Sequence, residues 1–243
     1  MLHFLEKVTT SYLKLGKLIV YLKFIFRKPF YIPENKHVPK NYLKLQNSSF
    51  FLINCLEEKI NILKKNLVNN ISVLDMCCAS GRHLKALQKT FGNKVDYYGF
   101  EINEKNKFYT EKYFPKLFLN SSIKYCDIRE FYNKNRLKYS ISFTHGRSID
   151  LVEPDFDLIK SICDTTEYYV ILCNLSNKSK SSYFRFWDYE FDRNGFKLLK
   201  HFEPESSYCE IPKGQKDRDF FSKIYIRKSI RGSKNFNKLK ELV

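Results

Sequence analysis

Several features are scarce in this sequence, and each scarcity excludes a class of protein. The seven cysteines form no CxxC pair and no Cys/His pattern with metal-ligand spacing, so we expect neither a zinc site nor a structural disulfide. No apolar run is uninterrupted enough to predict a membrane-spanning helix. A signal peptide of the usual form is absent, which makes the reducing cytoplasm the expected compartment. The remaining possibility is a globular domain: 243 residues, 43% of them hydrophobic, are enough for one α/β domain with a buried core.

Acidic residues are also scarce: 26 aspartates and glutamates stand against 43 lysines and arginines, for a formal charge of +17. A basic surface attracts nucleic acid, anionic lipid or phosphorylated substrates. Lysine outnumbers arginine, however, and arginine is favoured for bidentate phosphate recognition. Lysine, asparagine, isoleucine, phenylalanine and tyrosine all have AT-rich codons, so genome composition explains the charge as well as a functional surface does. The charge alone therefore identifies no partner.

The stretch at residues 71–101 predicts a strand, a tight loop, a helix and a second strand. The first apolar run ends in Asp75, and the second, at 95–100, ends in Glu101. The helix between them should be amphipathic, with an apolar face formed by Leu84, Leu87 and Phe91. A βαβ unit of this kind binds a nucleoside-like ligand at the carboxyl ends of its strands. The bland alternative is that any α/β protein contains such a unit with small residues at the turn.

The loop after Asp75 favours a cationic ligand over a dinucleotide. An anionic side chain at this position would repel a pyrophosphate and attract a cation. Here the sequence resembles the class I S-adenosylmethionine-dependent methyltransferases, whose first motif is D/E-x-G-x-G-x-G. Asp75 matches the motif acid, and Cys77, Ala79 and Gly81 occupy the three glycine positions, so two of the three are not glycine. The resemblance implies S-adenosylmethionine as cofactor, which carries an ammonium and a sulfonium and no phosphate. The two non-glycine residues imply a slightly narrower loop than the motif usually forms.

The resemblance spans about residues 70–227 and implies a role for three acids at the ends of three successive strands. Asp75 would hold the methionine amine, Glu101 the ribose diol, and Asp127, after a strand at 123–126, the adenine amino group. A surface charge pattern would rarely place acids in this way. The implied cofactor-binding set is Asp75, Cys77, Ala79, Gly81, Glu101, Ile102, Asp127, Ile128 and Thr144.

The fourth predicted strand, at 139–144, should end beside the methyl acceptor. His145 follows it and is the candidate general base, because an unperturbed imidazole suits proton removal near neutrality. The alternative is that His145 only contacts the cofactor or caps the next segment. Asp150 and Glu153 are alternate catalytic residues, and Arg147 is a candidate clamp for an anionic substrate.

The remaining segments complete a Rossmann-like α/β fold. We expect a seven-stranded, mostly parallel sheet with an antiparallel last strand, helices on both faces, and extra N-terminal helices. Further helices are predicted at 49–67, 103–114, 154–163 and 183–193, and further strands at 168–173, 196–202 and 220–227. Tyr189 and Tyr208 are candidate substrate-binding residues near the acceptor pocket.

The expected organisation is an N-terminal helical cap at 1–69, a cofactor-binding domain at 70–228 and a basic tail at 229–243. An amphipathic helix at 11–26 interrupted by lysines is read either as part of this cap or as a basic helix lying on a membrane surface. The membrane reading would make the protein membrane-peripheral. The oligomeric state stays open.

The thirteen residues from Trp187, WDYEFDRNGFKLL, resemble methyltransferases of cell-surface polysaccharide pathways. This resemblance implies O-methylation of a small polar, anionic acceptor: a sugar, a nucleotide sugar or a phosphoryl compound such as a capsule precursor. One alternative is an RNA methyltransferase, favoured by net charge. Against it, the fourth strand ends in Thr-His-Gly-Arg and not in Asn/Asp-Pro-Pro-aromatic, no Pro-Cys pair is present, and no RNA-binding module is recognisable. A second alternative is a non-catalytic, membrane-associated partner with a degenerate cofactor site.

Overall fold

The computed structural model describes residues 45–229, with gaps at 46, 67–69, 121, 147–148, 150–151, 153–155, 177–185 and 203–219. The predicted helix at 11–26 and almost the whole predicted tail lie outside the described residues. Among the described helices, none has the length and apolar composition needed to cross a bilayer.

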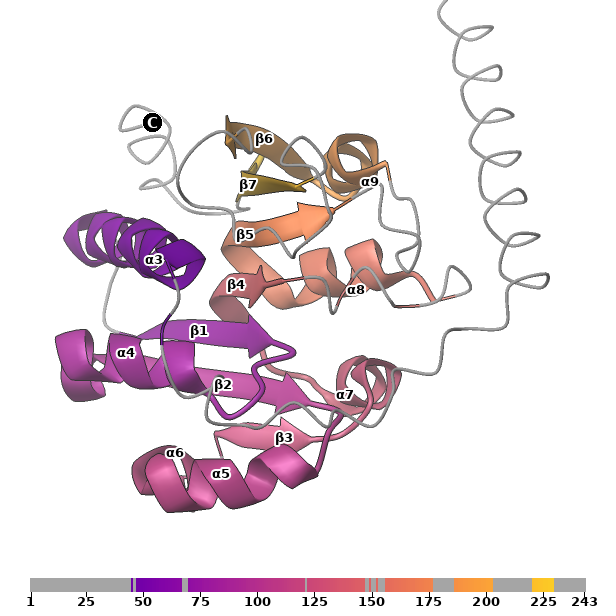
Figure 1. The fold of residues 1–243 in the computed structure, drawn as a ribbon. Coiled ribbons are helices and arrows are strands. Elements are labelled where there is room, and N and C mark those ends of the chain that lie inside the picture. The colour runs from indigo at the N-terminus through magenta and orange to yellow at the C-terminus, as the bar shows by residue number, and fades with distance from the viewer. Residues whose placement is uncertain are drawn as a thin grey trace, which may run out of the picture.

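Seven strands form one sheet in the order β3-β2-β1-β4-β5-β7-β6 (Figure 1). They are β1 (Ile71–Met76), β2 (Val95–Glu101), β3 (Ile123–Tyr125), β4 (Tyr139–His145), β5 (Thr166–Ser176), β6 (Phe196–Phe202) and β7 (Phe220–Arg227). Strands β1 to β5 pair in parallel, whereas β7 runs antiparallel to both β5 and β6. The predicted mostly parallel sheet with an antiparallel last strand is confirmed.

Helices cover both faces of this sheet, as predicted. They are α3 (Asn47–Asn66), α4 (Arg82–Phe91), α5 (Lys105–Tyr113), α6 (Pro115–Leu119), α7 (Ile128–Lys134), α8 (Leu158–Thr165) and α9 (Trp187–Arg193), with a short 3₁₀ turn at Gly92–Lys94. Helices α3 to α6 pack on one face, and α7, α8 and α9 pack on the other. Parallel strands that are covered on both sides are buried on both sides, which explains their apolar runs.

Two short helices were absent from the sequence prediction. The prediction ended a helix at Pro115, but Pro115 is the first residue of α6. Proline is tolerated there, because the amide hydrogen that it lacks would have no acceptor within the helix. Helix α7 begins after Asp127, whose side chain caps it by accepting a hydrogen bond from the Arg129 amide at 2.7 Å. Helix α3 begins at Asn47, two residues before the helix predicted at 49–67, so Ser49 lies in its first turn.

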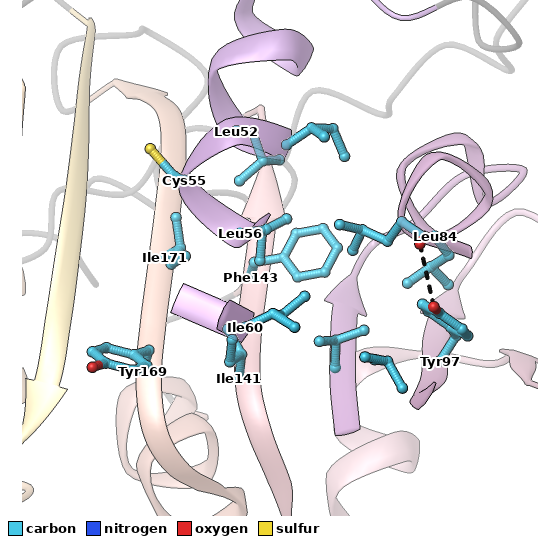
Figure 2. Packing of buried hydrophobic residues seen from close by; sticks show 14 of the residues in the cluster. Leu52, Cys55, Leu56, Ile60, Leu84, Tyr97, Ile141, Phe143, Tyr169 and Ile171 are labelled. Carbon is cyan, nitrogen blue, oxygen red and sulfur yellow. Dashed lines mark hydrogen bonds between the residues drawn. The ribbon is translucent and has the colours of Figure 1, made fainter. Parts of the chain in front are cut away.

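Helix α3 is held on the sheet by one broad apolar face (Figure 2). This face packs on strands β4 and β5, and Figure 2 labels the residues that meet there: Leu52, Cys55, Leu56, Ile60, Ile141, Phe143, Tyr169 and Ile171. Burying one such large apolar side chain stabilises the fold by about 1.5–3 kcal/mol. The start of α3 is therefore placed by many contacts and not by its own sequence alone.

The opposite face carries an aromatic cluster built around α9. The Phe191 ring stacks on Tyr225 of β7 with ring centroids 4.1 Å apart, and Trp187 stacks 6.5 Å from Phe191. All three side chains are almost fully buried. Helix α9 ends at Arg193, where the predicted helix ends, and is followed by Asn194 and by Gly195, whose φ of 84° favours glycine.

The six described cysteines are free thiols. Cys55, Cys163 and Cys173 are buried in the core, whereas Cys126 is only half-buried.

Candidate functional site

The candidate site lies where the order of the strands reverses. From β1 the chain runs outward to β2 and β3, and then crosses back to place β4 on the other side of β1. In Figure 1 the arrowheads of β1 and β2 point to the same edge of the sheet. In open α/β sheets, ligands bind outside the carboxyl ends of the strands at this reversal.

The loop between β1 and α4 keeps a glycine-type backbone without its glycines. Cys77, Ala79 and Gly81 have φ values of 62°, 51° and 85°, so every second residue lies in the left-handed region. These are the three positions that the motif assigns to glycine. A side chain in this region costs about 1–2 kcal/mol. The loop therefore holds its conformation against local preference at Cys77 and Ala79.

Two glycines allow this loop to lie directly on the neighbouring strands. A Cβ atom at Gly99 of β2 would lie 2.8 Å from the Cys78 sulfur. A Cβ at Gly81 would lie 2.7 Å from the Ile123 side chain of β3, a contact closer than real Cβ atoms make. No local sequence signal identifies Gly99, because its importance depends on Cys78, a residue of another element.

Glu101 links the loop after β1 to the loop after β2 through hydrogen bonds. Its buried carboxylate accepts hydrogen bonds from the Ala79 amide at 2.8 Å and, through its other oxygen, from the Asn103 amide at 2.9 Å. Burial raises the pKa of Glu101, and these amide hydrogen bonds oppose the rise. Each carboxylate oxygen has a second lone pair, so both can still accept a hydrogen bond from a ligand hydroxyl.

Asp75 lies one residue before the end of β1 and is 1% exposed. Burial raises its pKa well above the usual value, although the charge of Arg82 opposes the rise. The His83 Nδ1 atom lies 3.4 Å from an Asp75 carboxylate oxygen, and the His83 Nε2 atom lies 3.1 Å from the Ser49 hydroxyl. Sequence reasoning missed both His83 and Ser49, since α3 and α4 meet only in the folded chain.

His83 is a neutral imidazole. Burial, with a smaller effect from the Arg82 charge, lowers its pKa to about 3. Its contact with Asp75 is therefore a hydrogen bond between a neutral ring and a carboxyl group and not an ion pair. When Asp75 is ionised it only accepts hydrogen bonds, and in that state Nδ1 carries the proton and Nε2 accepts from Ser49.

His145 ends β4 on the same side of the sheet as His83, with ring centroids 5.0 Å apart. Burial lowers its pKa well below the usual value, and nearby His83 and Arg82 lower it further. The His145 pKa is therefore not the unperturbed value from which its role as a general base was predicted. The ring is neutral near pH 7 and able to accept a proton, but a lowered pKa makes it a weaker base.

The three acids predicted at the strand ends lie within electrostatic reach of one thiol. Burial raises the pKa of Cys77, and the charges of Glu101, Asp75 and Asp127 raise it further, in that order. One oxygen of Asp127 is already used in capping α7. The carboxylates thus share one region of the molecule at the carboxyl edge of the sheet.

Three other predicted cofactor residues differ in their surroundings. Thr144 is fully buried and donates a hydrogen bond to the Met76 carbonyl oxygen at 3.0 Å, which ties β4 to β1. Ile128 packs in the apolar core beneath α7, whereas the Ile102 side chain is 64% exposed. Thr144 and Ile128 therefore have evident packing roles, and Ile102 is accessible to a ligand.

Of the predicted substrate-binding residues, Tyr189 alone lies in the described part of the chain. Tyr189 lies on α9, which packs against β6 and α8, and its hydroxyl accepts a long hydrogen bond from Arg193 at 3.4 Å. Arg147, Asp150, Glu153 and Tyr208 lie outside the described residues. Their assignments stay predictions.

Several solved methyltransferase structures share this fold. Plantazolicin methyltransferase BpumL, solved with a triazolic desmethylPZN analog and SAH, is 14% identical with a TM-score of 0.57, over 90% of this chain and 99% of that chain. Magnesium protoporphyrin IX methyltransferase from Synechocystis PCC 6803, solved with bound SAM, is 14% identical with a TM-score of 0.52, over 84% and 96%. An S-adenosylmethionine-dependent methyltransferase from Clostridium acetobutylicum is 10% identical with a TM-score of 0.50, over 80% and 96%.

No family model and no curated protein matches the sequence. At these low identities the structural likeness establishes the fold alone, which is the Rossmann-like fold of the class I methyltransferases.

Proposed function

We propose that this protein is an S-adenosylmethionine-dependent methyltransferase. The observation that carries the proposal is the pairing of two buried carboxylates, Asp75 and Glu101, with a glycine-type loop at the reversal point of the sheet. The solved structures with this fold that were crystallised with SAM or SAH support it.

The residues present fit this cofactor. A buried carboxylate is costly unless a cation pairs with it, and the cofactor brings an ammonium and a sulfonium to the Asp75 side of the loop. Glu101 has acceptor capacity left for the two ribose hydroxyls. Asp127 would accept from the adenine amino group through its carboxylate, with Ile102 and Ile128 beside the ring. Cys77, Ala79 and Gly81 would let the backbone approach the ligand closely.

The bound cofactor would supply an activated methyl group on sulfur. The protein's own contribution would be to orient the acceptor and exclude water, effects worth roughly 7–11 kcal/mol when the geometry is near attack. His145, neutral at the end of β4, would accept the proton of an acceptor hydroxyl, with Asp150 and Glu153 as alternates. Arg147, Tyr189 and Tyr208 would bind the acceptor, which we propose to be a small anionic molecule such as a sugar or phosphoryl compound of a polysaccharide pathway.

Calorimetric titration with SAM and SAH tests the cofactor assignment. We expect binding by the wild-type protein and at least tenfold weaker binding by Asp75→Asn and by Glu101→Gln. Asp188→Asn is the matched control, because it removes a carboxylate on α9 and should leave the affinity unchanged. Absence of binding at millimolar cofactor would contradict the proposal and favour a non-catalytic partner. Transfer of labelled methyl groups to fractions of a cell extract would then identify the acceptor, and His145→Gln should reduce that transfer.

RNA is the second candidate acceptor, favoured by the formal charge of +17. Its test is RNA affinity over a range of salt concentrations, since phosphate contacts make affinity fall steeply as salt rises. A shallow salt dependence together with methylation of small molecules would exclude it.

A further inference from the structure

A line of three polar side chains crosses the apolar layer between α3 and β1. Ser49 in the first turn of α3 is 0% exposed, His83 of α4 is 4% exposed and Asp75 is 1% exposed. The Ser49 hydroxyl lies 3.1 Å from His83 Nε2, and His83 Nδ1 lies 3.4 Å from the Asp75 carboxylate. Buried polar groups are retained at a cost, so this line calls for an explanation.

The order of atoms is the one that activates a serine nucleophile in hydrolases. That role does not fit, because Ser49 lies where α3 packs on α4, whereas ligands of such sheets bind at the carboxyl ends of the strands. Of the three residues, Asp75 is instead the one that would contact a ligand, because it is proposed above to hold the cofactor's ammonium group. Ser49 then serves to orient the ring, and the ring serves to orient the carboxylate.

We propose that His83 is a positioning residue for cofactor binding, which holds one Asp75 oxygen through its Nδ1 hydrogen so that the carboxylate stays fixed and ionised for a cationic ligand. This inference rests on the proposed function. Ser49 selects the required tautomer by donating a hydrogen bond to Nε2. The position of α3 therefore affects the cofactor site through this one hydrogen bond.

The surroundings of Asp75 explain why such a donor matters. Burial favours the protonated carboxyl group, which cannot pair with an ammonium. The charged or titratable groups that face it are the following: Arg82 and His83 from α4, Glu101 from β2, and the thiols Cys77 and Cys78 from the loop. His145 from β4 lies against the His83 ring. Arg82 favours the carboxylate and Glu101 opposes it. Without the His83 donor, the pKa of Asp75 should rise further and the ligand should bind well only at higher pH.

Two substitutions at His83 separate its two hydrogen bonds. In His83→Asn the side-chain amide nitrogen takes the place of Nδ1 and keeps the donor to Asp75, while the acceptor for Ser49 is lost. In His83→Gln the amide nitrogen takes the place of Nε2, so the donor to Asp75 is lost. Each variant loses one buried partner, so their stabilities should fall by similar amounts.

The readout is the affinity for SAH, measured by calorimetry between pH 6 and pH 8.5. We expect His83→Asn to bind within threefold of wild type at pH 7, and His83→Gln to bind at least tenfold more weakly. The His83→Gln deficit should shrink as pH rises, whereas the wild-type affinity should change little over this range. Ser49→Ala should have an intermediate effect, because the tautomer is then no longer selected.

Each outcome has a distinct meaning. If wild-type protein binds SAH and both His83 variants bind like it, the positioning role is overturned and the cofactor assignment stands. Equal losses in the two variants with no pH dependence would show a merely structural histidine, which also overturns the inference. If wild-type protein does not bind SAH, the proposed function itself fails.

Discussion

The two halves of the sheet bury different kinds of side chain. The acidic half, which comprises β1, β2, β3 and the loops after them, buries Asp75 and Glu101 and holds Cys77 and Ala79 at positive φ. The hairpin half, which comprises β5, β7, β6 and helices α8 and α9, buries stacked aromatic rings. Its described ion pairs lie nearer the solvent, such as Lys223 with Asp188, whose side chain is 52% exposed.

The hairpin half therefore consists of contacts that stabilise the fold, whereas the acidic half contains groups that destabilise it locally. Buried carboxyl groups and left-handed side chains are unfavourable by themselves, and such features cluster at functional sites. Stacked, buried aromatics are favourable without any ligand. Substitutions in the hairpin half should therefore change stability alone, and those in the acidic half should change cofactor affinity as well.

Removal of the Phe191 ring should have the largest effect on stability. Phe191 is fully buried and stacks on Tyr225, so Phe191→Ala should lower the free energy of unfolding by about 3–5 kcal/mol. Urea denaturation measures this loss, and SAH affinity should stay unchanged. Phe108→Ala is the matched control, because this ring is 59% exposed, and its effect should stay below about 0.5 kcal/mol. A loss under 1 kcal/mol at Phe191 would remove the distinction between the two halves.

Two substitutions in the loop of the acidic half should have opposite signs. Gly81→Ala places a side chain at a φ of 85° and 2.7 Å from Ile123, and should destabilise the fold by about 2–4 kcal/mol. Ala79→Gly relieves a φ of 51° and should stabilise it by about 0.5–1 kcal/mol, since part of the gain is lost to unfolded-state entropy. Thermal and urea unfolding of both variants test the strain. Destabilisation by Ala79→Gly would contradict it.

The buried imidazole of His83 predicts a loss of stability in acid. Its pKa in the folded protein is about 3 against an ordinary 6.5, so below pH 6.5 the unfolded chain binds a proton that the folded chain does not. Stability must then fall as pH falls, by up to about 1.4 kcal/mol per pH unit. Asp75, with its raised pKa, has the opposite slope, but it is present in His83→Asn too.

The unfolding free energy of wild type relative to His83→Asn should therefore decrease by about 1–2 kcal/mol between pH 6.5 and pH 5. Urea denaturation at the two pH values measures it. A difference that does not change with pH would show that His83 is solvated or charged in the folded protein.

Asp188→Asn should have the smallest effect. Asp188 accepts hydrogen bonds from Lys223 and from the Tyr225 hydroxyl, both at 2.7 Å, and these outweigh the effect of burial and lower its pKa. The stabilisation is present above the ordinary pKa of 3.8 and is lost as pH falls through the lower value of the folded protein. Because the pair is partly exposed, we expect a loss of less than about 1 kcal/mol near pH 7, smaller still in high salt. A loss as large as that of Phe191→Ala would contradict the comparison.

Much of the fold was predictable because its signals are local. Apolar runs that end in Asp75 and Glu101 correspond to β1 and β2, and the Asn194-Gly195 pair ends α9. The spacing of Leu84, Leu87 and Phe91 correctly predicted the buried face of α4. The helices α6 and α7 were missed because each is short and depends on one terminal residue, Pro115 or Asp127.

The sequence by itself determined which residues become strands, which loop carries small residues and which strands end in acids, because each of these properties is contained in one short stretch of sequence. Only the tertiary structure decided that Ser49 and His83, 34 residues apart, meet behind Asp75, and that Gly99 must lack a side chain beneath Cys78. The physical reason is that a hydrogen bond or a steric contact between distant segments depends on how helices pack on the sheet, and no single stretch of sequence contains that arrangement.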